Sequence, residues 1–82
     1  MPENPKKILG NNVRRRRMAA GISQEELAGR ANLHRTYVGS LERGERNVAV
    51  ENIFALAKAL GCKPGELLSN SKMLETDHGP EG

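Results

Sequence analysis

Residues 22–46 read ISQEELAGRANLHRTYVGSLERGER and predict two short helices joined by a tight turn. Ser23 can cap the first helix, because its hydroxyl can accept from the N–H of Glu26 while the Glu26 carboxylate reaches back to Ser23. The first helix then runs through Ala31. Asn32 follows, and asparagine tolerates the left-handed conformation in which many helices end.

The second helix of the pair is predicted from about His34 to Arg43, with Gly44 as its stop. The apolar positions of the two helices are spaced so that both helices bury one shared face. These positions are Leu27, Ala28, Ala31, Leu33, Val38 and Leu41. The outward face of the second helix carries Arg35, Thr36, Tyr37, Gly39, Ser40 and Arg43. Such donors and small side chains differ from the Glu/Lys mixture of a solvated helix, so we expect this face to bind DNA.

The segment before this pair is predicted to form a helix over about residues 6–20, with Arg17 on its buried side. Arg17 shares the i, i+4, i+8 stripe of Leu9 and Val13, so its side chain points inward. A buried arginine requires a carboxylate partner, because an unpaired charge in an apolar setting is very costly. Glu42 is the candidate, so we expect an Arg17–Glu42 ion pair between the first and third helices.

Two more helices are predicted after the pair. One spans about residues 50–60 and lacks a good cap, because Ala49 occupies the cap position. Its apolar face consists of Val50, Ile53, Leu56, Ala57 and Leu60. The last spans about residues 64–68, with Pro64 at its first position. Strand-like alternation is absent from the sequence, so the predicted fold class is all-α with five helices.

The length of 82 residues allows one small domain. We expect a flexible N-terminus at residues 1–5, the domain at residues 6–69 and a flexible C-terminal tail at residues 70–82. The sequence has no run of about 18 apolar residues and no apolar leader, so neither a membrane span nor a secretory signal is expected. Cys62 is the only cysteine, which excludes an internal disulfide and favours a cytoplasmic location.

The net charge of +3 is unevenly distributed. The first fifty residues hold ten Lys/Arg and five Glu, whereas the remainder hold three Lys and five acids. This asymmetry suits a module with one face on a polyanion, although ordinary charge fluctuation produces it as often. One cysteine and two distant histidines supply no metal site. The serines lack a positioned base and no glycine-rich phosphate loop follows a strand, so neither catalysis nor a cofactor is expected.

Two segments, RMAAGISQEELAGRANLHRTYVGSLERGERN and ALAKALGCKPGELL, resemble the helix-turn-helix domains of the lambda-type repressor and Cro family (the xenobiotic-response-element type). The resemblance covers roughly residues 9–68. The shorter segment HRTYVGSLERGERN is also similar to the controller proteins of restriction–modification systems. The resemblance implies a compact five-helix lambda-repressor-like domain. It also implies a transcriptional regulator that binds a palindromic operator as a homodimer, with half-sites about 10 base pairs apart.

The resemblance also assigns the candidate DNA contacts, because such domains lay the second helix of the pair in the major groove. Base reading is expected from His34, Arg35, Thr36, Tyr37 and Ser40. Arg35 suits guanine, since a guanidinium can donate to O6 and N7 together. The ring of Tyr37 either leans toward the DNA or packs against the protein. Phosphate contacts are expected from Gln24, Ser23, Arg43, Arg46 and Asn47.

The acidic second half is expected to supply the dimer interface, since the basic half would face DNA. The candidates are Phe54, Leu67, Leu68 and Met73. Phe54 lies beside the apolar stripe of its helix, so core packing is the alternative for it. Contact with RNA polymerase is a further possibility, with Glu25 or Glu51 as acidic candidates. The other readings are a phage-type repressor, a DNA-binding antitoxin and, remotely, a protein-interaction module on the same scaffold.

Overall fold

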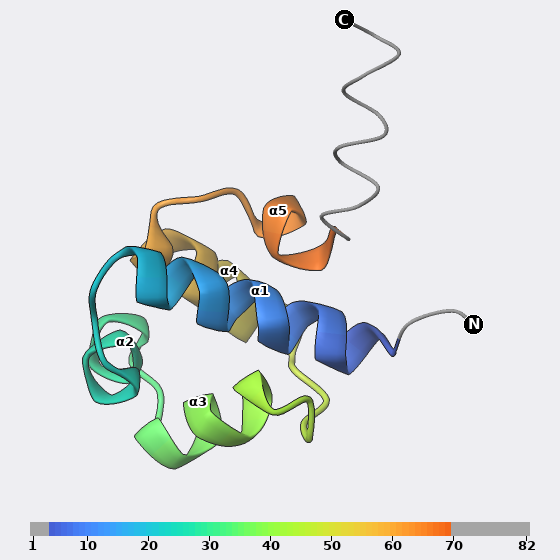
Figure 1. The fold of residues 1–82 in the computed structure, drawn as a ribbon, viewed down its shortest axis with the longest axis horizontal. Coiled ribbons are helices and arrows are strands. Elements are labelled where there is room, and N and C mark those ends of the chain that lie inside the picture. Colours follow the sequence, from blue (N-terminus) through green and yellow to red (C-terminus); the bar gives the residue numbers. More distant parts are fainter. Residues whose placement is uncertain (1–3, 70–82) are drawn as a thin grey trace, which may run out of the picture.

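The computed structural model describes residues 4–69, which form five helices and no strand (Figure 1). The helices are α1 (Pro5–Ala19), α2 (Gln24–Ala31), α3 (Arg35–Glu42), α4 (Val50–Leu60) and α5 (Pro64–Leu68). Helix α1 crosses the middle of the molecule, with α2 and α3 on one side and α5 on the other (Figure 1). The predicted all-α class is confirmed. None of the helices in this range is long and apolar enough to cross a membrane.

Helix α1 begins earlier than the sequence predicts. Asn4 caps it, because the Asn4 side chain accepts from the N–H of Lys6 at 2.8 Å, and Pro5 is the first helical residue. Proline suits this position, since its missing N–H would have no partner there. Asn4 and Pro5, assigned by the sequence to the N-terminal segment at residues 1–5, thus form the start of α1. The expected tail at residues 70–82 lies outside the described residues.

Ser23 and Asn32 lie at the two ends of α2, as predicted. Ser23 Oγ accepts from the N–H of Glu26 at 2.9 Å, whereas the Glu26 carboxylate accepts from Arg30 at 2.9 Å, so the Ser23 half of the predicted capping box is present. Asn32 adopts the left-handed conformation at the end of α2, with φ of 60°. His34 is the N-cap of α3 and makes no side-chain cap bond, so α3 begins one residue later than predicted.

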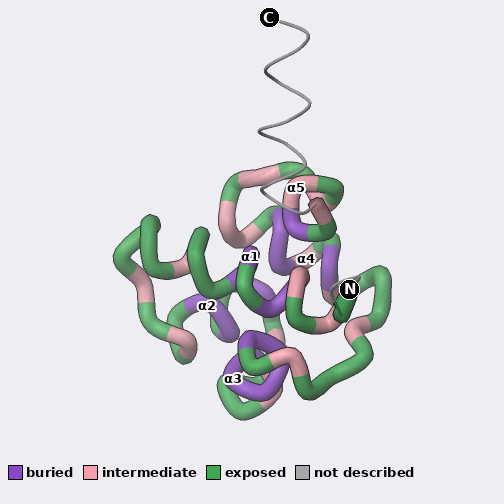
Figure 2. Tube along the Cα trace, turned by 45° about the vertical axis from the view of Figure 1, so that its right-hand side comes forward, coloured by how far each residue is buried: buried purple, intermediate pink, exposed green. Residues whose placement is uncertain are grey.

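The core lies where α1 to α5 meet, and its buried stretches are visible at the centre of Figure 2. The largest fully buried side chains are Leu27, Leu41, Leu56, Leu67, Val13 and Val38. One expectation about apolar positions is wrong. Val50 is 65% exposed because it is the first residue of α4 and lies at the edge of the apolar stripe. Leu33 and Leu60 are partly buried and pack against the core, as expected.

A close approach of α1 to α3 determines how α3 sits against α1. A Cβ atom at Gly10 would lie 2.7 Å from the carbonyl oxygen of Glu42 and closer still to that of Leu41. Only a residue without a side chain permits this distance between the backbones of two helices. The contact brings the end of α3 against α1, where Arg17 can reach Glu42.

Candidate nucleic-acid interface

The N-terminal end of α3 presents three exposed side chains, those of His34, Arg35 and Thr36. Arg35 has one nearby carboxylate, since its Nη1 lies 3.8 Å from Oε1 of Glu25 on α2. Ion pairs this long and this exposed contribute little to stability and are screened by salt. The guanidinium of Arg35 is therefore free to leave Glu25 for another acceptor.

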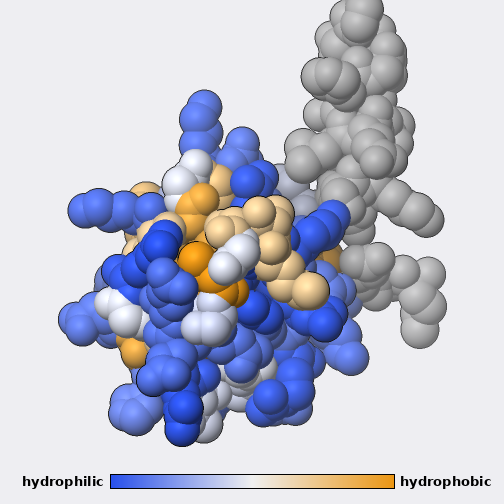
Figure 3. Space-filling model, turned by 60° about the vertical axis from the view of Figure 1, so that its left-hand side comes forward, coloured by the Kyte–Doolittle hydropathy of each residue, from blue (hydrophilic) through white to orange (hydrophobic). Residues whose placement is uncertain are grey.

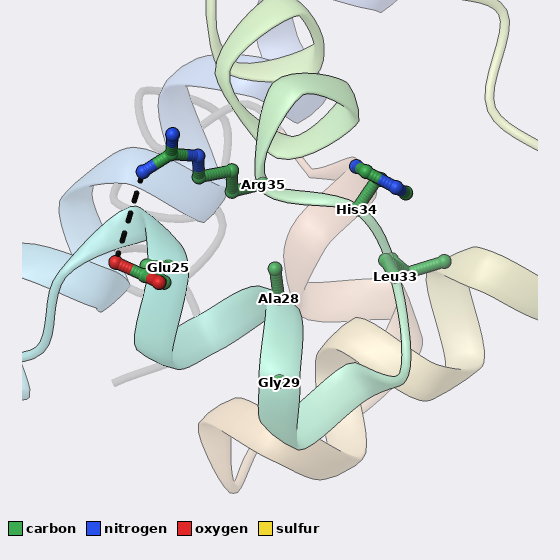
Figure 4. A pocket seen from close by; sticks show the side chains of 6 residues that line it. All are labelled: Glu25, Ala28, Gly29, Leu33, His34 and Arg35. Atoms are coloured by element: carbon green, nitrogen blue, oxygen red, sulfur yellow. Dashed lines mark ion pairs between the residues drawn. The ribbon is translucent and has the colours of Figure 1, made fainter.

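An open hollow of about 350 Å³ separates α2 from the start of α3. It is lined by Glu25, Ala28, Gly29, Leu33, His34 and Arg35. Figure 4 shows Arg35 and Glu25 pointing toward one another while His34 points away from them. The small residues on α2 leave space beside Arg35, so its long side chain can change direction without displacing packed neighbours.

Ser40 and Gly39, expected on the outward face of α3, are buried, whereas base reading by Ser40 stays a prediction. The Ser40 hydroxyl donates to the carbonyl of Tyr37 at 3.0 Å and accepts from Nε of Arg46 at 2.9 Å. The physical reason is that Arg46, in the loop after α3, folds back over this part of the helix. A base edge cannot reach Ser40 while Arg46 is in place.

Tyr37 bridges α3 and α4. Its hydroxyl accepts from Nδ2 of Asn52 at 3.2 Å, and the guanidinium carbon of Arg46 lies 5.7 Å from the centre of its ring. A cation over an aromatic face is held there by the ring quadrupole. These contacts support the alternative in which the ring of Tyr37 packs against the protein rather than leaning toward DNA. Sequence reasoning missed Asn52, because an asparagine within a helix gives no signal of a distant partner.

Two of the predicted phosphate-contacting residues come together beside Gly39. A Cβ atom there would lie 3.4 Å from both Arg43 Nη1 and Gln24 Oε1. Gln24 is the first residue of α2 and its Nε2 donates to Glu42 at 2.9 Å. Ser23 caps the same helix, whose first N–H groups carry partial positive charge. We call Ser23, Gln24, Gly39 and Arg43 the phosphate platform. Asn47 lies apart, exposed in the loop after α3.

Arg43 is also paired within the protein. Its Nε donates to Oε2 of Glu45 at 3.0 Å and its Nη2 donates to Oε1 at 3.3 Å. These bonds lower the pKa of Glu45 from its ordinary value and raise the pKa of Arg43. Glu45 was not singled out in the sequence, although its position two residues after Arg43 in a short loop could have suggested the contact.

The expected ion pair between α1 and α3 is present. Arg17 Nε donates to Glu42 Oε2 at 2.7 Å and Arg17 Nη2 donates to Oε1 at 3.1 Å. The two side chains are only 13% and 2% exposed. The hydrogen bonds to Glu42 raise the pKa of Arg17, against the effect of burial. Glu42 also accepts from Gln24, so the ion pair links α1, α2 and α3. It thereby fixes the position of Gln24 in the phosphate platform relative to α3.

Asn12 is a structural residue that sequence reasoning missed. It is buried on α1, and its Nδ2 donates to the carbonyls of Leu67 and Ser69, both at 2.8 Å. Its Oδ1 accepts from Nη2 of Arg15 at 2.9 Å. Arg16 lies 3.4 Å from Glu66 on α5. The basic run on α1 is therefore partly engaged in holding α5, rather than being only a solvated face.

The residues predicted to form the dimer interface differ in how far they are exposed. Phe54 and Leu68 are 59% and 54% exposed, so core packing is excluded for Phe54. Leu67 is fully buried, and the expectation that it lies in a dimer interface is contradicted because it fills the core between α1, α4 and α5. Met73 lies outside the described residues. Figure 3 shows an apolar patch at the centre of that view, surrounded mostly by hydrophilic side chains.

The comparisons with known proteins agree with this geometry. The helix-turn-helix family model HTH_3 matches residues 13–67. Control protein C.BamHI of Bacillus amyloliquefaciens is 45% identical over 69 residues, which are 83% of this chain and 85% of that protein. Control protein C.SmaI of Serratia marcescens is 50% identical over 64 residues, which are 78% of this chain and 76% of that protein.

A solved structure matches at the level of the whole fold. The crystal structure of the restriction–modification controller protein C.AhdI from Aeromonas hydrophila has a TM-score of 0.74 and 48% sequence identity to this chain. The match covers 76% of this chain and 94% of that one. The resemblance drawn from the sequence is thereby confirmed. With the family model covering more than half of its residues, the chain belongs to the HTH_3 helix-turn-helix family.

Proposed function

We propose that this protein is a sequence-specific double-stranded DNA-binding transcriptional regulator that controls a restriction–modification system and binds a palindromic operator as a homodimer. The observation that carries the proposal is the exposed row of His34, Arg35 and Thr36 at the start of α3, flanked by the phosphate platform. The control proteins among its relatives support the role in restriction–modification. We assign it no catalytic role, and we place it in the cytoplasm, where the nucleoid lies.

The proposed mechanism separates sequence choice from affinity. Arg35 donates to the O6 and N7 atoms of a guanine in the major groove, and Thr36 contacts a thymine methyl or a base acceptor. Gln24 and Arg43 bind the backbone phosphates at one side of the groove, with Arg46 and Asn47 nearby. Phosphate contacts fix the register of the domain on the duplex and carry no sequence information. Glu25 and Glu51, both exposed, are the acidic candidates for a contact with RNA polymerase.

Replacing Gln24 or Arg43 with alanine is expected to weaken binding to specific and random DNA by the same factor. The physical reason is that both side chains contact the backbone, which is alike in every sequence. Loss of Arg43 should also reduce the slope of log K against log salt by about 1. Fluorescence anisotropy titrations at several salt concentrations measure both quantities. A loss confined to operator DNA would contradict the assignment of these residues to phosphates.

Replacing Phe54 with lysine is expected to convert the homodimer to a monomer without unfolding it. Phe54 and Leu68 are large exposed apolar side chains from the second half of the chain, and a charge in an apolar interface must be desolvated. Sedimentation at high micromolar concentration measures the change. Met18→Lys is the matched control, since Met18 is 56% exposed but lies on α1. Wild-type protein that sediments as a monomer would remove the dimer from the proposal.

The proposal as a whole is tested by titrating the protein into a duplex taken from the DNA upstream of its own gene. We expect binding that weakens with salt and that exceeds binding to a random duplex by about a thousandfold or more. A controller should also have methyltransferase and endonuclease genes beside its own. Failure to bind either duplex at low salt would support the interaction-module alternative and contradict DNA binding.

A further inference from the structure

Arg43 and Glu45 form an ion pair inside the surface that is proposed to face DNA. The two side chains are 61% and 55% exposed, and the carboxylate accepts from Nε and Nη2 of the guanidinium. The remaining nitrogen, Nη1, is the one near Gly39 and Gln24. Glu45 therefore occupies one edge of the Arg43 guanidinium and leaves the other edge at the phosphate platform.

This arrangement affects how strongly the platform attracts a polyanion. A carboxylate 3.0 Å from the guanidinium cancels most of its charge at longer range. Because both side chains are exposed, the pair can open when a phosphate arrives, but the carboxylate is then left beside the phosphate and must take up a cation. The lowered pKa of Glu45 means that this carboxylate is charged throughout the physiological range.

We propose that Glu45 sets the strength of DNA binding by pairing with Arg43 in the free protein, so that Arg43 must exchange a carboxylate for a phosphate when the domain docks. Glu45 is a positioning residue that acts through Arg43, and it leaves base reading by Arg35 unchanged. This inference rests on the proposed function, since it requires that Arg43 faces the DNA backbone. It assigns an attenuating role to an acidic residue within a basic surface.

The test compares wild type, Glu45→Gln, Arg43→Gln and the double variant on a random duplex and on operator DNA. Glu45→Gln is expected to tighten binding to both duplexes about fivefold at about 0.1 M salt. Its plot of log K against log salt should steepen by up to about 0.9, the slope of one phosphate contact. In the Arg43→Gln background the same substitution should give a clearly smaller gain, because the ion pair is gone and only the repulsion between the carboxylate and the backbone phosphates is relieved.

Glu66→Gln is the matched control. Glu66 pairs with Arg16 at 3.4 Å and lies on α5, on the opposite side of α1 from α3 (Figure 1). This variant removes the same charge and is expected to bind like wild type. A Glu45→Gln gain that persists at full size in the Arg43→Gln background would show a general charge effect and overturn the inference. If the wild type binds DNA and the Glu45→Gln variant binds no more tightly, the inference is also overturned. A wild type that binds no duplex would overturn the proposed function as well.

Discussion

Replacing Arg17 with alanine is expected to lower the free energy of unfolding by about 3–5 kcal/mol, the usual effect of breaking a buried ion pair. The substitution removes both hydrogen bonds to Glu42 and the bond from Arg17 Nη1 to the carbonyl of Ile22. Glu42, only 2% exposed, would keep Gln24 as its side-chain partner and remain a buried charge. Urea denaturation of the variant and the wild type measures the difference.

Two comparison variants separate the buried pair from a general charge effect. Arg16→Ala removes a neighbouring arginine whose pair with Glu66 is exposed, so it should change stability by less than about 1 kcal/mol. The double variant Arg17→Met with Glu42→Leu replaces the pair by apolar side chains and should recover most of the loss. An Arg17→Ala variant with an unfolding midpoint close to that of wild type would show that the pair does not stabilise the fold.

Replacing Arg35 with alanine is expected to reduce the preference for operator over random DNA by about 1–3 kcal/mol, which corresponds to about 5- to 150-fold. Binding to random DNA should change little, because the guanidinium is proposed to contact a base. Competition titrations with both duplexes measure the ratio. Arg30→Ala is the matched control, since Arg30 is exposed on α2 and pairs with Glu26. Equal losses on both duplexes for Arg35→Ala would assign this side chain to the backbone instead.

The fold was largely predictable because local signals agree with tertiary packing. Ser23, Asn32 and Gly44 mark helix ends through their own backbone and side-chain chemistry, which needs no distant partner. The Arg17–Glu42 contact was predictable for a different reason. A charge on an apolar stripe must find a partner, and Glu42, near the end of α3, was the candidate acid.

The errors concern residues whose environment depends on a loop or on another helix. Ser40 lies on the predicted outward face of α3, but Arg46 from the following loop covers it. Leu67 and Leu68 are adjacent and chemically identical, yet only the packing of α5 on α1 and α4 shows which one is buried. Asn12 was missed because its two acceptors, the carbonyls of Leu67 and Ser69, are more than fifty residues away in sequence.

Selection of bound duplexes from a pool of random sequences tests the central claim, that α3 reads DNA as part of a symmetric dimer. We expect the recovered sequences to share one short motif in two copies related by a two-fold axis, with centres about 10 base pairs apart. Recovery of duplexes that share no motif, from protein that is folded and dimeric, would contradict this account.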